Sequence, residues 1–411
     1  MRKKCWALIL IVLFWMIGKP QAEARIIKVP WDYTRIQDAI AAAAFGDEVI
    51  VDPGTYYEYL ALKPGVAVRA KGTKEERKNH VTSRRTVIDA NGENWATVVE
   101  GADFAAIDGF GLTGLGILDH HTPGHAHGIQ CRGHSAIIIN NEIYRMGSTG
   151  IGNHVKGKLR SMSYIANNIV YDNNGLGIGC NHNSSPSIIG NTIYNNRDVG
   201  IGCKNGAHPL VEMNLIYSNG TSGVGAKDGA YPVILSNRIH DNGKRRIAAN
   251  GAGIGADNTI VPLIENNNVS SNYLAGIGIR RQSVTTIRNN ETSFNRFAGI
   301  GLDNVKFALI EGNLIRENNK GGIGITNNSS AYITKNIITK NINAAISPRS
   351  KGKVTIAKDN EIRDNGVPFK AEPPAFTKAG YNPLSGERTS DKPPPGLPDP
   401  TFFNWVSPKA K

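Results

Sequence analysis

The chain has 411 residues and carries 47 Lys and Arg against 34 Asp and Glu, which gives a formal net charge of +13 at pH 7. Its 46 glycines, with no long helical pattern outside the N-terminus, exclude an ordinary α/β domain. A basic exported surface favours an anionic partner such as acidic polysaccharide or a cell-surface glycan, and the alternative is a surface kept basic for solubility. We expect no nucleic-acid partner, because no motif interleaves basic and aromatic residues.

The N-terminus has the pattern of a secretory signal peptide. Residues 2–4 are basic, residues 6–17 are uncharged and apolar, and residues 22–24 supply a small-x-small cleavage pattern. The apolar run is shorter than the roughly 20 residues of a membrane span. We therefore expect residues 1–24 to be removed, leaving a secreted or periplasmic protein without a membrane anchor. The segment carries four cations and one carboxylate, so its removal lowers the formal charge from +13 to +10.

A repeat of 23 residues organises the rest of the chain. One series of asparagines follows this interval with a few changes of spacing: Asn141, Asn168, Asn191, Asn214, Asn237, Asn267, Asn290, Asn313, Asn336 and Asn360. A second series stands five residues after most of these: Asn173, Asn196, Asn219, Asn242, Asn272, Asn295, Asn318, Asn341 and Asn365. The tripeptide Gly-Ile/Val-Gly begins at Gly150, Gly177, Gly200, Gly223, Gly253, Gly276, Gly299 and Gly322, with degenerate copies at Gly128 and Ala345. These are ten registered coils, and about twelve with the less regular ones before Gly128.

The letters of one coil predict its structure. Alternation places Ile201 and Cys203 on one face of a short strand and Gly200, Gly202 and Lys204 on the other. Strands this short cannot bury a face alone, so each coil must stack on its neighbours about 4.8 Å away. Stacking predicts one interior column: Ile129, Ile151, Ile178, Ile201, Val224, Ile254, Ile277, Ile300, Ile323 and Ile346. The asparagines are expected in turns, as hydrogen-bonded ladders at positions that tolerate left-handed backbone. The parallel crossovers predict a right-handed coil.

This repeat resembles the parallel β-helix repeat of the pectin-lyase-like superfamily, which includes carbohydrate-binding proteins, sugar hydrolases and NosD-type periplasmic proteins. The segment Thr34–Tyr59 looks like that superfamily's N-terminal cap, in which a short amphipathic helix around Ile36 and Ile40 plugs the end of the core before the strand Val49–Val51. The fold class is therefore all-β, a single-stranded right-handed parallel β-helix with an N-terminal helical cap. The domain runs over residues 25–366, with the cap at about 26–60, and a Pro-rich tail follows at 367–411.

The outward face of the glycine strand is the predicted binding surface. Two glycine columns would leave it bare, and beside them runs an outward column: Arg132, His154, Asn181, Lys204, Lys227, Asp257, Arg280, Asp303 and Thr326. Two inserted loops add cations, among them Arg245 and Arg246. We interpret Arg132, His154, Lys204, Lys227, Asp257, Arg280, Asp303, Arg245 and Arg246 as substrate-binding residues for an acidic polysaccharide. The alternative is that the glycines only ease coil packing and the charges are a solvated face.

Catalysis is less specified by the sequence. A polysaccharide lyase needs a cation for the uronate carboxylate and a base for the carbon-bound proton, for which Lys227, Asp257 and Arg280 are the candidates. Asp257 and Asp303 would lie roughly 9–10 Å apart, near the upper limit for an inverting hydrolase pair, with Arg280 between them. The Asp-Pro-His-Asp signature of alginate epimerases and the paired aspartates of polygalacturonases are absent. The sequence thus leaves open whether the protein is an enzyme.

Six histidines cluster in the sequence: His120, His121, His125, His127, His134 and His154. Imidazoles suit copper or zinc, and the NosD-like resemblance favours periplasmic copper. The predicted ligands are His120, His121, His125 and His127, although His127 is expected to point inward at a strand start. Copper and calcium are the cofactor candidates. The alternative is a His-rich loop without a ligand, because the spacing of a structural zinc site is absent.

Cys131, Cys180 and Cys203 share the inward position after the Gly-Ile-Gly motif. Cys180 and Cys203 lie on adjacent coils, close enough for a disulfide, but buried thiols that fill the core are the favoured interpretation.

The leading hypothesis is an exported β-helix protein that binds acidic polysaccharide, and either only binds it or also cleaves or modifies it. The alternative is a non-catalytic accessory or structural periplasmic β-helix that handles copper through the His-rich loop.

Overall fold

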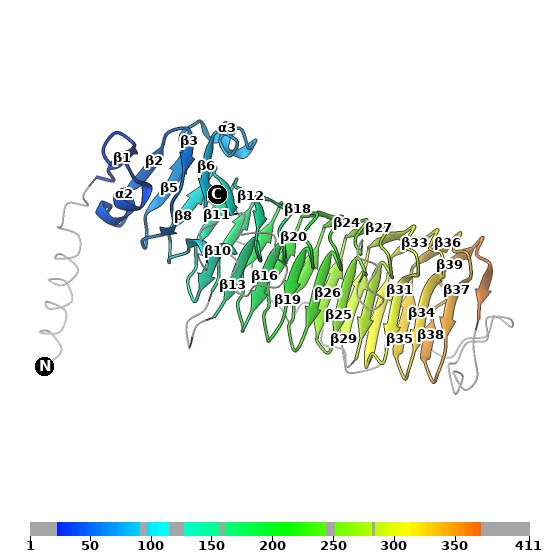
Figure 1. Ribbon diagram of the computed structural model, residues 1–411. Coiled ribbons are helices and arrows are strands. Elements are labelled where there is room, and N and C mark those ends of the chain that lie inside the picture. The colour runs from blue at the N-terminus through cyan, green and yellow to red at the C-terminus, as the bar shows by residue number, and fades with distance from the viewer. Residues whose placement is uncertain are drawn as a thin grey trace, which may run out of the picture.

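The computed structural model describes residues 23–90, 97–114, 127–155, 157, 161–243, 251–281 and 284–370. These residues form three parallel sheets wound into one long right-handed solenoid, as predicted (Figure 1). The sheets have 14, 13 and 13 strands, so the solenoid has more coils than the twelve expected from the repeat. In the described part of the chain, no helix is long and apolar enough to cross a membrane. Of the predicted signal peptide, residues 1–24, and the predicted tail, residues 367–411, the structure describes only residues 23–24 and 367–370.

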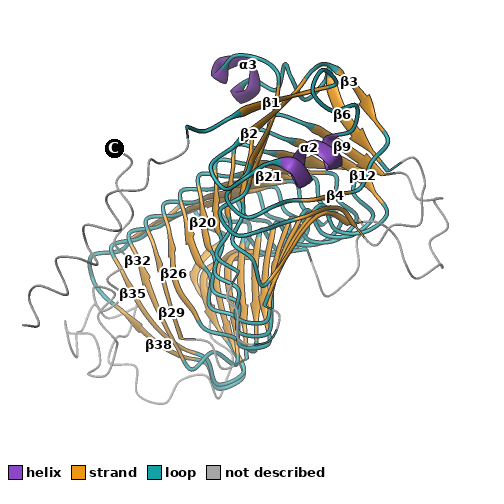
Figure 2. Cartoon of the chain, turned by 90° about the vertical axis from the view of Figure 1, so that its left-hand side faces the viewer, coloured by secondary structure: helices purple, strands orange, loops and turns teal. Residues whose placement is uncertain are grey.

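The first sheet, sheet A, begins the solenoid and contributes one of its three faces (Figure 2). Its strands, in stacking order, are β1 (Ile26–Val29), β2 (Glu48–Val51), β5 (Ala67–Ala70), β8 (Ala106–Asp108), β11 (Ile137–Ile139), β14 (Tyr164–Ala166), β17 (Ser187–Ile189), β20 (Leu210–Glu212), β23 (Val233–Leu235), β26 (Val261–Glu265), β29 (Val284–Arg288), β32 (Phe307–Glu311), β35 (Ser330–Thr334) and β38 (Lys353–Ile356).

Sheet B follows sheet A in most coils, across a sharp corner. Its strands are β3 (Gly54–Tyr56), β6 (Thr86–Asp89), β9 (Gly111–Gly114), β12 (Glu142–Met146), β15 (Ile169–Tyr171), β18 (Thr192–Tyr194), β21 (Leu215–Tyr217), β24 (Arg238–His240), β27 (Asn268–Ser270), β30 (Glu291–Ser293), β33 (Leu314–Arg316), β36 (Ile337–Thr339) and β39 (Glu361–Arg363).

Sheet C contains the Gly-Ile-Gly motifs. Its strands are β4 (Leu60–Ala61), β7 (Thr97–Glu100), β10 (His127–Arg132), β13 (Ile151–His154), β16 (Ile178–Asn181), β19 (Ile201–Cys203), β22 (Val224–Lys227), β25 (Ile254–Asp257), β28 (Ile277–Arg280), β31 (Ala298–Asp303), β34 (Gly321–Thr326), β37 (Ala344–Pro348) and β40 (Val367–Phe369).

A short helix closes the N-terminal end of the core, as predicted. Helix α2 (Ile36–Ala42) buries Ile36, Ala39 and Ile40 and contacts β1, β2 and β4. The order of the cap differs from the expectation, because β1 precedes the helix and pairs with β2 as the first strand of sheet A. A second helix, α3 (Lys74–Lys78), buries no side chain and is held at its start by a capping box between Thr73 and Glu76.

The predicted interior column is confirmed. Each of its members is paired in register with the next, from Ile129 in β10 to Ile346 in β37. All ten side chains are at most 1% exposed. Burying one such side chain contributes roughly 1.5–3 kcal/mol, so the column forms a large part of the core energy.

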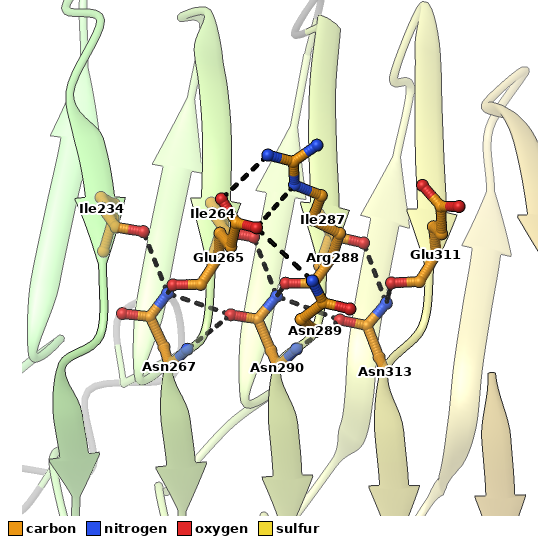
Figure 3. Close-up of polar contacts among 10 residues, drawn as sticks. All are labelled: Ile234, Ile264, Glu265, Asn267, Ile287, Arg288, Asn289, Asn290, Glu311 and Asn313. Carbon is orange, nitrogen blue, oxygen red and sulfur yellow. Dashed lines mark hydrogen bonds and ion pairs between the residues drawn. The ribbon is translucent and has the colours of Figure 1, made fainter. Parts of the chain in front are cut away.

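Two asparagine ladders hold the corners of the solenoid, one between sheets A and B and one between sheets B and C. Asn290 shows the pattern (Figure 3). Its Nδ2 donates to Asn313 Oδ1 at 3.0 Å and to the carbonyl oxygens of Ile264 and Arg288, both at 2.9 Å. Its Oδ1 accepts from the backbone N and the Nδ2 of Asn267, at 2.9 and 3.0 Å. Every polar atom of this buried amide is therefore satisfied by neighbouring coils.

The left-handed residues lie one position earlier than expected. No ladder asparagine has a positive φ, and the residue before each one except Asn360 does, for example Ser236 (55°), Asn289 (54°) and Gly312 (65°). The left-handed residue turns the chain, while the asparagine after it points its amide into the corner. The ladder positions therefore do not use the left-handed backbone that asparagine tolerates.

Replacing one ladder amide should destabilise the protein strongly. Asn290→Ala leaves buried donors of Asn267 and buried carbonyls without partners, so we expect a loss of about 3 kcal/mol in the free energy of unfolding. Asn268→Ala removes an exposed side chain with one bond to Glu291 and should change stability by less than about 0.5 kcal/mol. Urea denaturation of both variants measures the difference, and equal losses would contradict the ladder's role.

Candidate functional site

The outward face of sheet C is hollowed into a groove of about 1250 Å³. Its floor is the second glycine of each Gly-Ile/Val-Gly motif: Gly152, Gly179, Gly202, Gly225, Gly255, Gly278, Gly301 and Gly324. Because these residues have no side chain, a ligand in the groove would lie against bare backbone. The predicted binding face therefore exists as a groove that runs along the solenoid.

The first glycine of each motif does not line this groove, which corrects the prediction of two outward glycine columns. A Cβ built on Gly276 would lie 2.7 Å from the carbonyl oxygen of Gly299 and 2.7 Å from Asn295 Nδ2. The first glycine is buried at the corner before the strand, where the next coil and the ladder leave no room for a methyl group. The two glycines thus have different tasks: the first permits close coil packing and the second opens the floor.

One wall of the groove becomes lower towards the C-terminal coils. It is formed by the residues that precede the first glycines: Thr149, Leu176, Val199, Ser222, Ala252, Ala275, Ala298 and Gly321. A Cβ on Gly202 would overlap the Leu176 side chain, whereas one on Gly301 would reach only Ala275, at 3.8 Å. Leu176 therefore covers the floor near β19, and the groove is open from about β25 to β34.

The other wall is the predicted outward column, and the structure brings its members together. Register pairs Arg132 with His154, His154 with Asn181, Lys227 with Asp257, Asp257 with Arg280, Arg280 with Asp303, and Asp303 with Thr326. Lys204, Lys227 and Arg280 are exposed, and the rest are half-buried. The inserted residues Arg245 and Arg246 lie outside the described residues.

Most charges of this wall are engaged with a partner. Asp257 forms a two-pronged ion pair with Arg281, and that hydrogen bond lowers the pKa of the Asp257 carboxyl below its ordinary value of 3.8. Arg280 Nε lies 3.7 Å from Asp303 Oδ2. Lys227 Nζ lies 3.9 Å from Asp228 Oδ2 at the edge of the same wall. The sequence did not reveal Arg281 and Asp228 as part of this network, because each stands one residue beyond the column.

The exposed cations of the groove include Lys204 on the charged wall and Lys320 on the opposite wall, and neither has a carboxylate partner among the described residues. Lys320 Nζ lies 4.5 Å from the centre of the Phe297 ring, and Phe297 is 38% exposed. Sequence reasoning missed both Lys320 and Phe297. The repeat could have placed them at the groove, since each stands two residues before the first glycine of its coil.

Of the six clustered histidines, the structure describes His127, His134 and His154. His127 begins β10 as predicted, but it is half-buried rather than inside the core. Burial and the nearby His154 and Arg132 lower the pKa of His127 to about 4. Burial, with Arg132 next in importance, also lowers the pKa of His154. His120, His121 and His125 lie outside the described residues, and within the described ranges no group of three or more His, Cys, Asp or Glu is placed to hold a metal ion.

The three cysteines occupy the interior as predicted. Cys131, Cys180 and Cys203 are buried free thiols, and Cys180 is paired in register with Cys203. The hydrogen bond with Cys203 and burial raise the pKa of the Cys180 thiol well above its ordinary value. Burial raises the pKa of Cys131 to about 11. These thiols are therefore core groups and unsuited to nucleophilic chemistry.

Sheet B carries a column of aromatic side chains that the sequence analysis did not identify. Tyr144, Tyr171, Tyr194, Tyr217 and His240 stack with ring centres 4.9–5.3 Å apart. Each ring face lies against its neighbour, so a sugar ring cannot stack on the inner members. The column stabilises the coils and is not a second groove.

The two glycines of one motif should respond differently to a methyl group. Gly276→Ala places its Cβ against the backbone of Gly299 and should lower the free energy of unfolding by about 1–3 kcal/mol. Gly278→Ala meets only the Ala252 and Ala275 methyls, at 3.7 and 3.8 Å, and should leave stability unchanged or slightly higher. Thermal melting of the two variants measures this. A Gly278→Ala variant that melts as low as Gly276→Ala would show that the floor is not open.

Comparisons with known proteins agree with this architecture. The family described as "Right handed beta helix region" matches residues 127–261 and 250–371. A search of curated proteins finds no match.

Three solved structures share the fold. The A-modules of mannuronan C-5 epimerases AlgE6 and AlgE4 from Azotobacter vinelandii have TM-scores of 0.53 and 0.52 at 16% and 18% identity. Each comparison covers 82% of this chain, and 89% and 91% of theirs. The catalytic unit of a GH87 α-1,3-glucanase from Streptomyces thermodiastaticus has a TM-score of 0.63 at 13% identity, over 86% of this chain and 69% of that one. Because the family match covers more than half of its residues, this chain belongs to the right-handed β-helix family.

Proposed function

We propose that this is an exported protein, secreted or periplasmic, that binds an acidic polysaccharide in the groove of sheet C. The observation that supports the proposal most is a floor of bare glycines beside a wall that contains Lys204, Lys227 and Arg280; the predicted Arg132 does not line the groove and lies beside Glu100. From Gly152 to Gly324 the floor spans seven coil steps, about 34 Å at 4.8 Å per step, and its open part from Gly255 to Gly324 spans three steps, about 14 Å. A groove of that length suits a polymer and exceeds the size of a single sugar.

Two kinds of evidence favour a glycan over another polyanion. The fold neighbours with TM-scores above 0.5 are named for mannuronan and α-1,3-glucan chemistry. In the groove itself, small apolar residues such as Ala275 and Ala298 face the charged column across the floor. A sugar ring has both apolar C–H faces and polar edges, so it matches a groove with one apolar and one charged wall.

The two carboxylates of the charged wall, Asp257 and Asp303, argue against a glycosidase mechanism. Glycoside hydrolysis needs a carboxylic acid whose pKa is raised so that it holds a proton near neutral pH. Asp257 has the opposite property, because the ion pair with Arg281 lowers its pKa. Asp303 lies beside Arg280 and accepts a hydrogen bond from Asn327. Neither residue is arranged as the general acid of an inverting pair.

A lyase reaction is the remaining enzymatic candidate, and it would use Lys227 and Arg280 to neutralise a uronate carboxylate. The base would have to be Lys227 or Asp257, and Asp257 is a weak base while it is paired with Arg281. Ultraviolet absorbance of the unsaturated product, measured with a panel of uronate polymers, distinguishes a lyase from a protein that only binds. We favour binding without cleavage, since both carboxylates of the charged wall, Asp257 and Asp303, lie beside arginines.

Removing the positive charge of the groove should abolish retention on an acidic polysaccharide. The triple variant Lys204→Gln, Lys227→Gln, Arg280→Gln loses three cations that face one ligand. At about 0.5–1 kcal/mol for each exposed pair, affinity should fall by roughly tenfold to a hundredfold. Affinity electrophoresis through a gel containing a polyuronate measures the change.

The matched control removes three exposed lysines outside the groove, Lys306, Lys340 and Lys353, and so lowers the net charge equally. The control variant should keep most of its retention. Equal losses in the two variants would show that binding follows net charge alone, and unchanged retention in the groove variant would remove the proposed site.

A further inference from the structure

The two unpaired cations of the groove lie far apart and on opposite walls. Lys204 follows β19, and Lys320 precedes β34. Five coil steps separate these strands in sheet C, about 24 Å at 4.8 Å per step. Both side chains are exposed and line the groove. An anion bound at one of them therefore cannot reach the other unless it belongs to an extended molecule.

The stretch between them is close to electrically neutral. Lys227 lies beside Asp228, Asp257 is paired with Arg281, and Arg280 lies near Asp303. These six residues carry three positive and three negative charges. The groove thus has a lysine at each end of a neutral middle section, and the carboxylate of Asp198 lines the opposite wall on the coil of Lys204.

Phe297 fixes the position of the Lys320 ammonium. A cation 4.5 Å from an aromatic ring centre gains about 0.5–1 kcal/mol at an exposed site. The long lysine chain is thereby held at the rim of the groove instead of sampling solvent. A similar pair on the same turn, Arg316 over Phe294 at 5.4 Å, does not line the groove and has Glu291 and Glu317 as partners.

We propose that the groove holds its ligand by two-point anchoring, with Lys204 and Lys320 each binding one anionic group of the same glycan chain. This rests on the proposed function and specifies its ligand. The recognised molecule is an acidic glycan segment long enough to bridge about 24 Å, with charged sugars at both ends of the bridge. The sugars between them need not be charged, because the middle of the groove offers no net charge to neutralise.

The effect of substituting either lysine should therefore depend on the length of the bound glycan. A ligand that spans both lysines gains from an intramolecular second contact, whereas a short one occupies either lysine alone. For oligouronates too short to bridge, Lys204→Gln or Lys320→Gln alone should weaken binding by no more than about twofold, since the other anchor remains. For oligouronates that exceed the bridge, each single substitution should weaken binding by about tenfold or more.

Isothermal titration calorimetry with oligouronates of increasing length tests this, with Lys306→Gln as the control. Penalties that do not depend on ligand length would overturn two-point anchoring while leaving the groove as a binding site. Failure of the unmodified protein to bind any length of oligouronate would instead overturn the proposed function.

A second pair of variants tests the role of the aromatic ring. Phe297→Ala should weaken binding of long oligouronates in the same direction as Lys320→Gln, and thermal melting should show an unchanged fold. Phe294→Ala removes the more exposed ring of the same turn and should leave binding unchanged. Equal effects of the two substitutions, or none from Phe297→Ala, would show that the ring does not position the ammonium.

Discussion

Buried amides at the corners of the solenoid must find hydrogen-bond partners in the neighbouring coils, and the register of the whole structure depends on this constraint. At each rung, Asn290 and its equivalents give and receive their bonds one coil away. A shift of one residue in any coil would leave several buried donors and carbonyls without partners, at about 1–3 kcal/mol each. Burial of the apolar core, which includes the isoleucine column, supplies the driving force, but burial alone is non-directional. The ladders make the observed register lower in free energy than registers shifted by one residue.

The groove is a consequence of that register. Once Ile277 and Ile300 are held in one column, the second glycines are aligned on the opposite side of the same strands, and the charged residues after them form a wall. Where the groove is open depends on the size of the side chain that precedes the first glycine. Leu176 covers the floor at one end, whereas the smaller Ala275 leaves it bare further on. A repeat that is uniform inside thus produces a surface that varies along its length, and this variation gives the groove a neutral middle between two free lysines.

Sequence reasoning recovered the features that follow from strict periodicity. Ile201 lies inside, Asn290 lies in a ladder, and Asp257 lies in the outward column because each repeats at a constant offset. Gly200 was placed on the wrong face, since β19 begins only at Ile201 and the alternation of a strand does not extend into the corner before it. The pairing of Asp257 with Arg281 and of Lys320 with Phe297 depends on side chains of different coils, and neither the interval nor the composition predicts such contacts.

The most direct test of the account is a crystal structure of the protein with an oligouronate longer than the bridge between the two free lysines. We predict that the sugar chain runs parallel to the solenoid axis from the coil of Gly202 to the coil of Gly324, with its anionic groups at Lys204 and Lys320. A chain bound across the strands, or on sheet A or sheet B, would contradict the claim that the glycine floor is the binding surface.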